Sequence, residues 1–149
     1  MPAYRDQRQI VITAAPADCF GVLTDYARMP EWQSRVCECR VLEADDAGRG
    51  SLVQYAIDAK LRVVRYQLRH LYDEPNWIGS EYVKGDFKDF AGDYRFRPQA
   101  DRTHVNFSLR IDPGFKVPGA IARMLGQAVM GKSLQDLKRR VEEAPRGPQ

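Results

Sequence analysis

The chain of 149 residues has the length of one domain, and this length can bury a core large enough for independent stability. Hydrophobic residues make up 44% and charged residues 29% of the chain, a composition typical of globular proteins rather than disordered ones, and no apolar run approaches the roughly 18 residues of a membrane-spanning helix. The net charge of +3 is too small to indicate specific nucleic-acid binding, and the N-terminus lacks the apolar core of a signal peptide, so we expect a cytoplasmic protein.

The first predicted elements are one strand and two short helices. Residues 8–15 ("RQIVITAA") have the composition of a short strand. Apolar residues at helical spacing predict a helix over residues 15–29, with Pro16 in its first turn and Pro30 ending it. Residues 30–34 predict a second, brief helical turn.

The hydrophobic pattern then changes to a period of two residues, which is typical of half-buried strands. The segment 61–73, for example, places Tyr66, Leu68 and His70 on one face and mostly arginines on the other. Short turns separate the segments, so we expect neighbouring strands to be antiparallel. The six predicted strands are residues 36–45, 51–59, 61–73, 76–83, 88–98 and 102–112.

The last predicted element is a long C-terminal helix. An apolar stripe with helical period runs through Ile121, Leu125, Ala128, Leu134 and Leu137, which predicts about 25 helical residues. A helix of that length can cover the apolar concave face of a curved sheet of six to seven strands. We expect residues 1–144 to form one domain and residues 145–149 to be a disordered tail.

Three segments carry a family resemblance. The segment "VLTDYARMPEWQSRV" (22–36) resembles the helix-end signature of the START-like (SRPBCC) superfamily. The segments "VKGDFKDFAGDYRFRP" (83–98) and "THVNFSLRIDPG" (103–114) are similar to its coenzyme Q-binding, ribosome-association-toxin and polyketide cyclase/dehydrase branches. The resemblance implies an α+β helix-grip (START/Bet v 1-like) fold, with a deep cavity between sheet and C-terminal helix that holds an apolar or aromatic molecule.

Strand parity independently supports a cavity, because the predicted inward faces are rich in tyrosine. Tyrosine presents an apolar ring with a polar tip, which suits a pocket lining, although at strand ends the hydroxyls can also reach solvent. Trp32 is a candidate for the cavity rim or for a hydrophobic plug between helix and sheet. The predicted ligand-binding residues are Trp32, Tyr55, Ile57, Tyr66, Leu68, His70, Phe90, Gly92, Tyr94, Phe107, Leu109, Met124 and Leu125.

Gly92 interrupts a row of aromatic residues on its strand. A glycine weakens a strand, so its presence between Phe90 and Tyr94 indicates a bend of the sheet or the close approach of another group. We expect Gly92 to face the C-terminal helix, with the bend as the main cause and ligand space as the lesser one.

His70 is the one candidate catalytic residue. A neutral imidazole on an apolar face can donate to a ketone or quinone oxygen, or transfer a proton during an aldol cyclisation. A core histidine with satisfied hydrogen bonds is the structural alternative. The sequence contains no nucleophile elbow and no glycine-rich phosphate loop, so no catalytic set can be assigned.

We expect neither a metal nor a cofactor. The chain has three cysteines, an odd number, and Cys37 and Cys39 lie two residues apart on one predicted strand, where a disulfide is unfavourable. A Cys-Glu-Cys zinc site would need further ligands, and the two histidines, His70 and His104, are the only imidazoles. Reduced, half-buried thiols are the favoured interpretation.

Three functions are compatible with these observations. The first is a carrier or chaperone that binds a quinone, a polyprenyl lipid or an aromatic polyketide-like molecule. The second is an aromatase/cyclase-type enzyme that uses His70 and a tyrosine in the same cavity. The third is a regulatory protein whose basic residues make a weak ribosome or membrane contact. Those basic residues are Lys132, Lys138, Arg139, Arg140 and Arg146 near the C-terminus, and Lys60, Arg62, Arg65 and Arg69 on or beside a strand.

Overall fold

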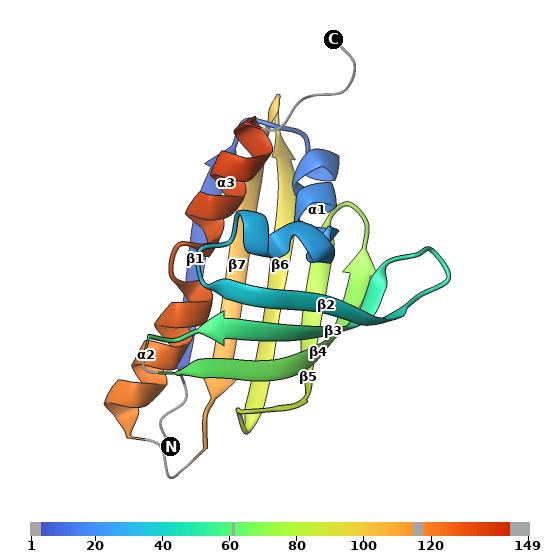
Figure 1. Ribbon diagram of the computed structural model, residues 1–149. Coiled ribbons are helices and arrows are strands. Elements are labelled where there is room, and N and C mark those ends of the chain that lie inside the picture. The colour runs from blue at the N-terminus through green and yellow to red at the C-terminus, as the bar shows by residue number, and fades with distance from the viewer. Residues whose placement is uncertain (1–3, 61, 115–117, 144–149) are drawn as a thin grey trace.

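Seven strands form one antiparallel sheet in the order β1-β7-β6-β5-β4-β3-β2 (Figure 1). The structure, a computed structural model, describes residues 4–60, 62–114 and 118–143. The predicted tail at residues 145–149 lies outside these described residues. The strands are β1 (Tyr4–Ile12), β2 (Val36–Ala44), β3 (Gly50–Asp58), β4 (Val63–Asp73), β5 (Trp77–Gly85), β6 (Asp89–Gln99) and β7 (Arg102–Asp112).

The predicted strand pattern is confirmed, except that the first strand, β1, spans Tyr4–Ile12 rather than residues 8–15. Every neighbouring pair is antiparallel, and on β4 the buried residues alternate with exposed or half-buried ones from Val64 to His70. On β7 the alternation runs from Thr103 to Ile111, so the apolar set of each strand lies on the same face of the sheet. That face is concave and carries the core.

The first helical segment differs from the prediction. Helix α1 (Pro16–Thr24) ends at Thr24, and a separate 3-10 helix, η1 (Tyr26–Glu31), follows it. The chain leaves the helical conformation at Asp25, whose N–H donates to Val22 O. The α-helix therefore stops before Pro30, and Pro30 lies inside η1 rather than ending the first helix.

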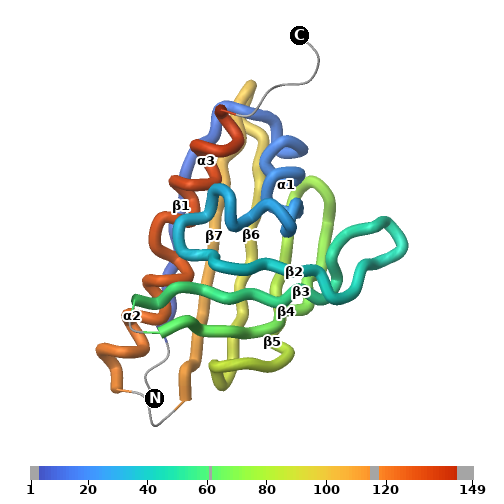
Figure 2. The backbone as a smooth tube through the Cα atoms, viewed as in Figure 1, coloured from blue at the N-terminus to red at the C-terminus, as the bar shows by residue number. Residues whose placement is uncertain are grey.

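The predicted C-terminal helical segment is present but interrupted. It consists of α2 (Gly119–Met130) and α3 (Ser133–Glu143), which lie end to end along the sheet beside β1 (Figures 1 and 2). A β-carbon at Gly131 would lie 2.7 Å from the carbonyl oxygen of Gln127, so this junction requires glycine. The apolar stripe continues across it, because Ala128, Leu134 and Leu137 are all buried.

The sheet bends along β4, so that β2 and β3 lie across the direction of β5 and β6 (Figures 1 and 2). The pairing between β5 and β6 is short. These two strands pair only from Trp77–Glu81 to Ala91–Arg95, whereas β6 and β7 pair along their full lengths. A register shift between Gln67 and Leu68 further bends the β4–β5 pair. As a result β2, β3 and β4 cross in front of β6 and β7 (Figures 1 and 2) and close the concave face on one side.

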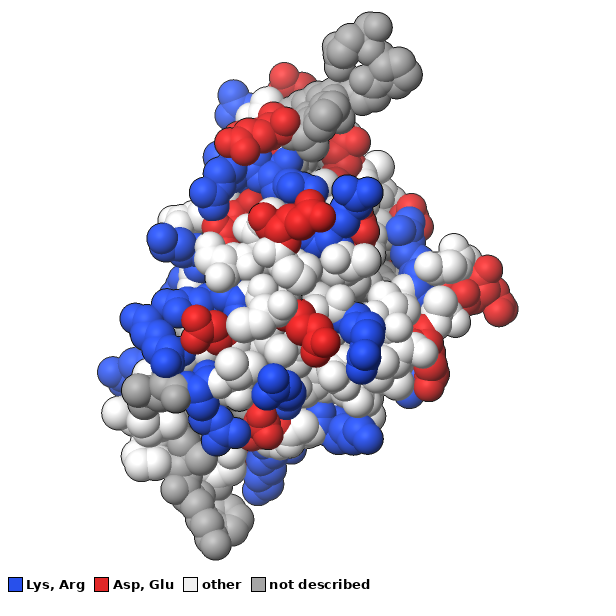
Figure 3. All heavy atoms as spheres, in the orientation of Figure 1, with Lys and Arg blue, Asp and Glu red and all other residues white. Residues whose placement is uncertain are grey.

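Charged side chains of both signs are interspersed over the face drawn in Figure 3. In the part of the chain that is described, no helix is long and apolar enough to cross a membrane. The cytoplasmic location stays a prediction.

Candidate functional site

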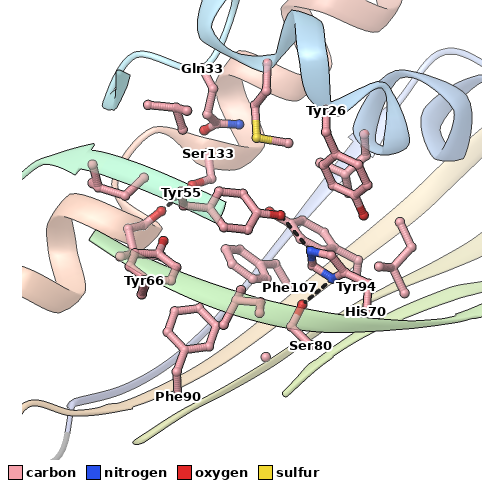
Figure 4. Close-up of a pocket in the computed structure, with 18 residues that line it drawn as sticks. Tyr26, Gln33, Tyr55, Tyr66, His70, Ser80, Phe90, Tyr94, Phe107 and Ser133 are labelled. Atoms are coloured by element: carbon pink, nitrogen blue, oxygen red, sulfur yellow. Dashed lines mark hydrogen bonds between the residues drawn. The ribbon is translucent and has the colours of Figure 1, made fainter. Parts of the chain in front are cut away.

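The concave side of the sheet encloses a cavity beneath η1 and the junction of α2 and α3 (Figure 4). The cavity has a volume of about 80 Å³. The accessible surface of its lining is mainly apolar. The lining residues are Leu23, Tyr26, Met29, Gln33, Val36, Tyr55, Ile57, Tyr66, Leu68, His70, Ile78, Ser80, Phe90, Gly92, Tyr94, Phe107, Val129 and Ser133.

Most of the predicted ligand-binding residues lie together on this lining. The four that do not are Trp32 and Leu125, which pack partly buried against the core, Leu109, which is buried within it, and Met124, which faces a different hollow. Trp32 thus matches the plug interpretation better than the rim interpretation. The nine predicted residues that line the cavity are Tyr55, Ile57, Tyr66, Leu68, His70, Phe90, Gly92, Tyr94 and Phe107. Their role in binding a ligand stays a prediction.

The other half of the lining, which was not predicted from the sequence, comes from the helices, from β5 and from the segment Gln33 to Val36 that leads into β2. Tyr26 and Met29 enter the cavity from η1, and their burial depends on how η1 packs against β2. Ser80 lies opposite His70 in the β4–β5 register, so it could be identified only after that pairing was known. Gln33 and Ser133 gave no hydrophobic signal at all.

Stacked aromatic rings form the walls. Tyr66 stacks between Tyr55 and Phe90, with centroid distances of 5.4 and 5.3 Å. On the neighbouring strands Tyr94 stacks on Phe107 at 4.1 Å with nearly parallel planes. Flat surfaces of this kind favour a planar, aromatic guest over a branched one.

His70 is held by hydrogen bonds on both ring nitrogens (Figure 4). Its Nε2 lies 2.6 Å from the Tyr55 hydroxyl, and its Nδ1 lies 3.0 Å from Ser80 Oγ and 3.3 Å from the carbonyl oxygen of Gly79. A carbonyl can only accept, so we assign the proton to Nδ1, and Nε2 then accepts from Tyr55. Tyr26 covers the ring in a stacked arrangement at 5.1 Å.

Burial keeps His70 uncharged. Desolvation lowers the pKa of its imidazole to about 4, although the Gly79 carbonyl favours the protonated form. Burial also raises the pKa of Tyr55 well above its usual value, so the phenol stays protonated. The pair is neutral at physiological pH and can supply hydrogen bonds but no fixed charge.

The tyrosine hydroxyls on the lining fall into two groups. Tyr26 donates to the Tyr72 hydroxyl at 2.7 Å, and Tyr55 is engaged with His70. The hydroxyls of Tyr66 and Tyr94 make no hydrogen bond to any described residue, while burial raises the pKa of both phenols. These two phenols are therefore protonated donors available to a molecule in the cavity.

Gly92 and Ser80 are adjacent small residues on the floor. They are cross-strand partners on β6 and β5, and both line the cavity. The three atoms nearest to a β-carbon on Gly92 would all belong to the sheet: Ser108 O at 3.3 Å and side-chain carbons of Leu109 and Phe90 at 3.5 Å. The register of β6 with both neighbours is regular through Gly92, so no bulge accompanies the expected bend, and the close approach of Ser108, Leu109 and Phe90 is what a side chain here would meet.

A second hollow adjoins the cavity at the junction of α2 and α3. Gln33 and Ser133 line both spaces and therefore form the boundary between them. Beside this boundary, Ser34 donates to the buried carboxylate of Asp136 from its backbone N–H at 2.9 Å and from its hydroxyl at 2.7 Å. This Ser34–Asp136 clasp ties the segment between η1 and β2 to α3.

Two of the three cysteines are buried and one is exposed. All three are free, Cys37 is exposed, and burial raises the pKa of Cys39 to about 12 and that of Cys19 to about 11. No group of three or more His, Cys, Asp or Glu side chains within residues 4–60, 62–114 and 118–143 could hold a metal ion.

The fold has many counterparts among solved structures. A START superfamily protein from Mycobacterium smegmatis superposes with a TM-score of 0.83 at 19% identity, covering 93% of this chain and 97% of that one. A protein from Thermus thermophilus superposes with a TM-score of 0.81 at 21% identity, covering 96% of this chain and 100% of that one. The Zhui aromatase/cyclase from Streptomyces sp. R1128 superposes with a TM-score of 0.82 at 15% identity, covering 97% of each chain.

These likenesses establish the helix-grip START/Bet v 1-like fold. Among curated proteins, none matches the chain in sequence. The sequence pattern of the family described as polyketide cyclase/dehydrase and lipid transport, however, matches residues 12–138, which is most of the chain. The protein therefore belongs to the polyketide cyclase/dehydrase and lipid transport family of the START-like (SRPBCC) superfamily.

Proposed function

We propose that this protein binds an aromatic, oxygen-bearing small molecule in the cavity, as a carrier or chaperone. Membership of the family implies hydrophobic ligand binding in general. The observation that carries the finer proposal is the pair of unpartnered phenols, Tyr66 and Tyr94, on a lining of stacked rings. A quinone or an aromatic polyketide supplies both the flat ring system and the acceptor oxygens, whereas a polyprenyl chain supplies neither.

Two matched ligands test this proposal. Fluorenone and fluorene have the same ring skeleton, but only fluorenone has a carbonyl oxygen to accept from a phenol. We expect the protein to bind fluorenone more tightly, and Tyr66→Phe or Tyr94→Phe to weaken fluorenone binding by about fivefold to tenfold, which corresponds to one hydrogen bond. Fluorene binding should not change.

The control is Tyr82→Phe. Tyr82 donates to the carbonyl oxygen of Phe87 and does not line the cavity, so its removal should leave both affinities unchanged. Intrinsic fluorescence quenching gives the affinities, and mass spectrometry of an organic extract of the purified protein identifies any natural ligand. If neither compound binds and no small molecule is extracted, the proposal is wrong.

An aromatase/cyclase-type enzyme is the second candidate, and the Tyr55–His70 hydrogen bond is the observation that favours it. A neutral imidazole with a protonated phenol can move a proton to or from a polyketide carbonyl. This function predicts that His70→Gln abolishes turnover of a linear aromatic polyketide mimic while fluorenone affinity stays within about twofold. If the His70→Gln variant kept full turnover, His70 would not be catalytic, and ligand binding would be the only supported role of the cavity.

A further inference from the structure

The hollow beside the cavity is lined by cationic side chains without acidic partners. Arg35, Lys60 and Lys132 line it, and none of them forms an ion pair with a described residue. Many other basic residues, such as Arg49 and Arg110, are paired with a carboxylate. The three cations of the hollow therefore keep their charge available.

The one carboxylate of the hollow does not neutralise them. Asp136 is only 1% exposed, and its two oxygens accept from Ser34 and from Arg139. The negative charge of Asp136 is therefore compensated by Ser34 and Arg139 rather than by the cations of the hollow. The hollow consequently has a net positive lining, and a recess lined by one sign of charge concentrates the electrostatic potential.

The position of the hollow connects this charge to the proposed ligand. It meets the apolar cavity at Gln33 and Ser133, both of which are uncharged and polar. In Figure 3, Lys and Arg side chains gather on the left, over the region of the α2–α3 junction and the nearby ends of β2 and β3. A molecule that reached from the cavity past Gln33 and Ser133 would place its end among these cations.

We propose that the hollow binds the anionic head of an amphipathic organic acid whose apolar, aromatic body occupies the cavity. This inference rests on the proposed function and narrows its ligand class to acids with a carboxylate at one end. The cavity buries the aromatic rings of the ligand, and the cations of the hollow favour the ionised carboxylic acid over a neutral analogue of the same ligand.

Dansyl-undecanoic acid and its primary amide test this inference. The two probes share an aromatic body and a flexible chain and differ only in the charge at one end. We expect the acid to bind about tenfold more tightly than the amide at low salt, as several exposed charge contacts act together. The ratio should fall toward one in about 1 M NaCl, where screening acts over about 3 Å.

Variants locate the effect. The double variant Lys60→Gln, Lys132→Gln should reduce the ratio of acid affinity to amide affinity to below about threefold and leave the amide affinity unchanged. Adding Arg35→Gln should bring this ratio to about one. Both lysines are exposed, so the variants should melt like the parent protein. Arg40→Gln, an exposed residue of β2 outside the hollow, is the matched control and should keep the full ratio.

The outcomes separate the two proposals. Equal affinity for acid and amide in the parent protein, or a ratio unchanged in the lysine variants, overturns the inference while cavity binding stands. Failure of both dansyl probes and of fluorenone to bind overturns the proposed function, and the acid-head site with it.

Discussion

His70 combines a satisfied hydrogen-bonding environment with a place on the cavity wall. Both ring nitrogens have partners, as expected for a core histidine, yet the ring also lines the space that a ligand would occupy. These two roles make different demands on its charge. A charged imidazole would lose hydration without gaining a carboxylate, because its hydrogen-bond partners are a phenol, a hydroxyl and a carbonyl.

The pKa of His70 predicts acid sensitivity of the fold. Its pKa is about 4 in the folded protein and near the usual 6.5 when unfolded, so the unfolded chain binds the extra proton first. The stability is fully present above about pH 6.5 and is lost as the pH falls toward 4. Chemical denaturation should show that the free energy of unfolding drops by about 3 kcal/mol more in the parent than in His70→Gln between pH 7 and 4.

Comparison with His70→Gln removes the contribution of other groups. The pKa values of Asp6 and Glu142 are also lowered, Asp6 through hydrogen bonds that outweigh its desolvation and Glu142 chiefly through Lys138, but both residues remain in the variant. Parallel pH profiles for the two proteins would show that His70 is not held neutral.

Gly92 supplies depth to the cavity floor, so Gly92→Val should fill it. We expect a loss of about 1–3 kcal/mol in stability from overpacking against Ser108 O and Leu109, and about tenfold weaker fluorenone binding. Ala91→Val, one residue away on the outer face, is the control and should change neither quantity. Fluorenone affinity equal to that of the parent would place Gly92 outside the binding space.

Among the elements, the strands could be predicted from sequence far better than the helical breaks. Strand parity identified the faces of Tyr55, Tyr66 and Tyr94 because period-two patterning is a local property. The ends of α1 and α2 depend on backbone conformation at Asp25 and Gly131, which single-residue propensities do not specify. The apolar stripe of the last segment remained in phase across Gly131, so it indicated one helix where there are two.

The binding site was predictable only where it lies on the sheet. The helix-derived lining and the cationic hollow arise from packing between segments about 100 residues apart, as the contact of Ser34 with Asp136 illustrates. Polar residues such as Gln33 and Ser133 carry no periodic signal. Their roles appear only when the elements are assembled.

The Ser34–Asp136 clasp should be a strong local contribution to stability. Asp136→Asn removes the charge of a buried acceptor and should cost about 2 kcal/mol, because hydrogen bonds to charged groups are worth about 1.5–3 kcal/mol each. Arg139→Gln removes only the exposed partner of the same carboxylate and should cost less than about 0.5 kcal/mol. Urea denaturation measures both, and equal losses would show that the surface ion pair is the stabilising contact.

For the whole molecule, occupancy of the cavity should stabilise the fold. A ligand that binds only the folded state adds about 2.7 kcal/mol at a hundredfold excess over Kd. Thermal melts with fluorenone should therefore show Tm rising with ligand concentration, and Gly92→Val should show a smaller rise at equal concentration. A Tm independent of fluorenone in the parent would mean that the folded state gains nothing from the ligand.

The surface charge does not favour a single large anionic partner. Lys138, Arg139 and Arg140 near the C-terminus are paired with acids, whereas Lys132 is not, and Figure 3 shows both signs over the same face. The weak contact with a ribosome or membrane that the basic residues suggest stays a prediction.

The clasp also has a kinetic consequence. Its hydrogen bonds join the segment beside Gln33 to α3 beside Ser133, and they are made between protein groups whether the cavity is empty or filled. Because these hydrogen bonds are present with the cavity empty and with it filled, they do not change the equilibrium affinity for the ligand. They must break, however, if the boundary at Gln33 and Ser133 is to open. Entry and release rates should then slow together, so that the clasp governs the residence time of the ligand and leaves Kd almost unaltered.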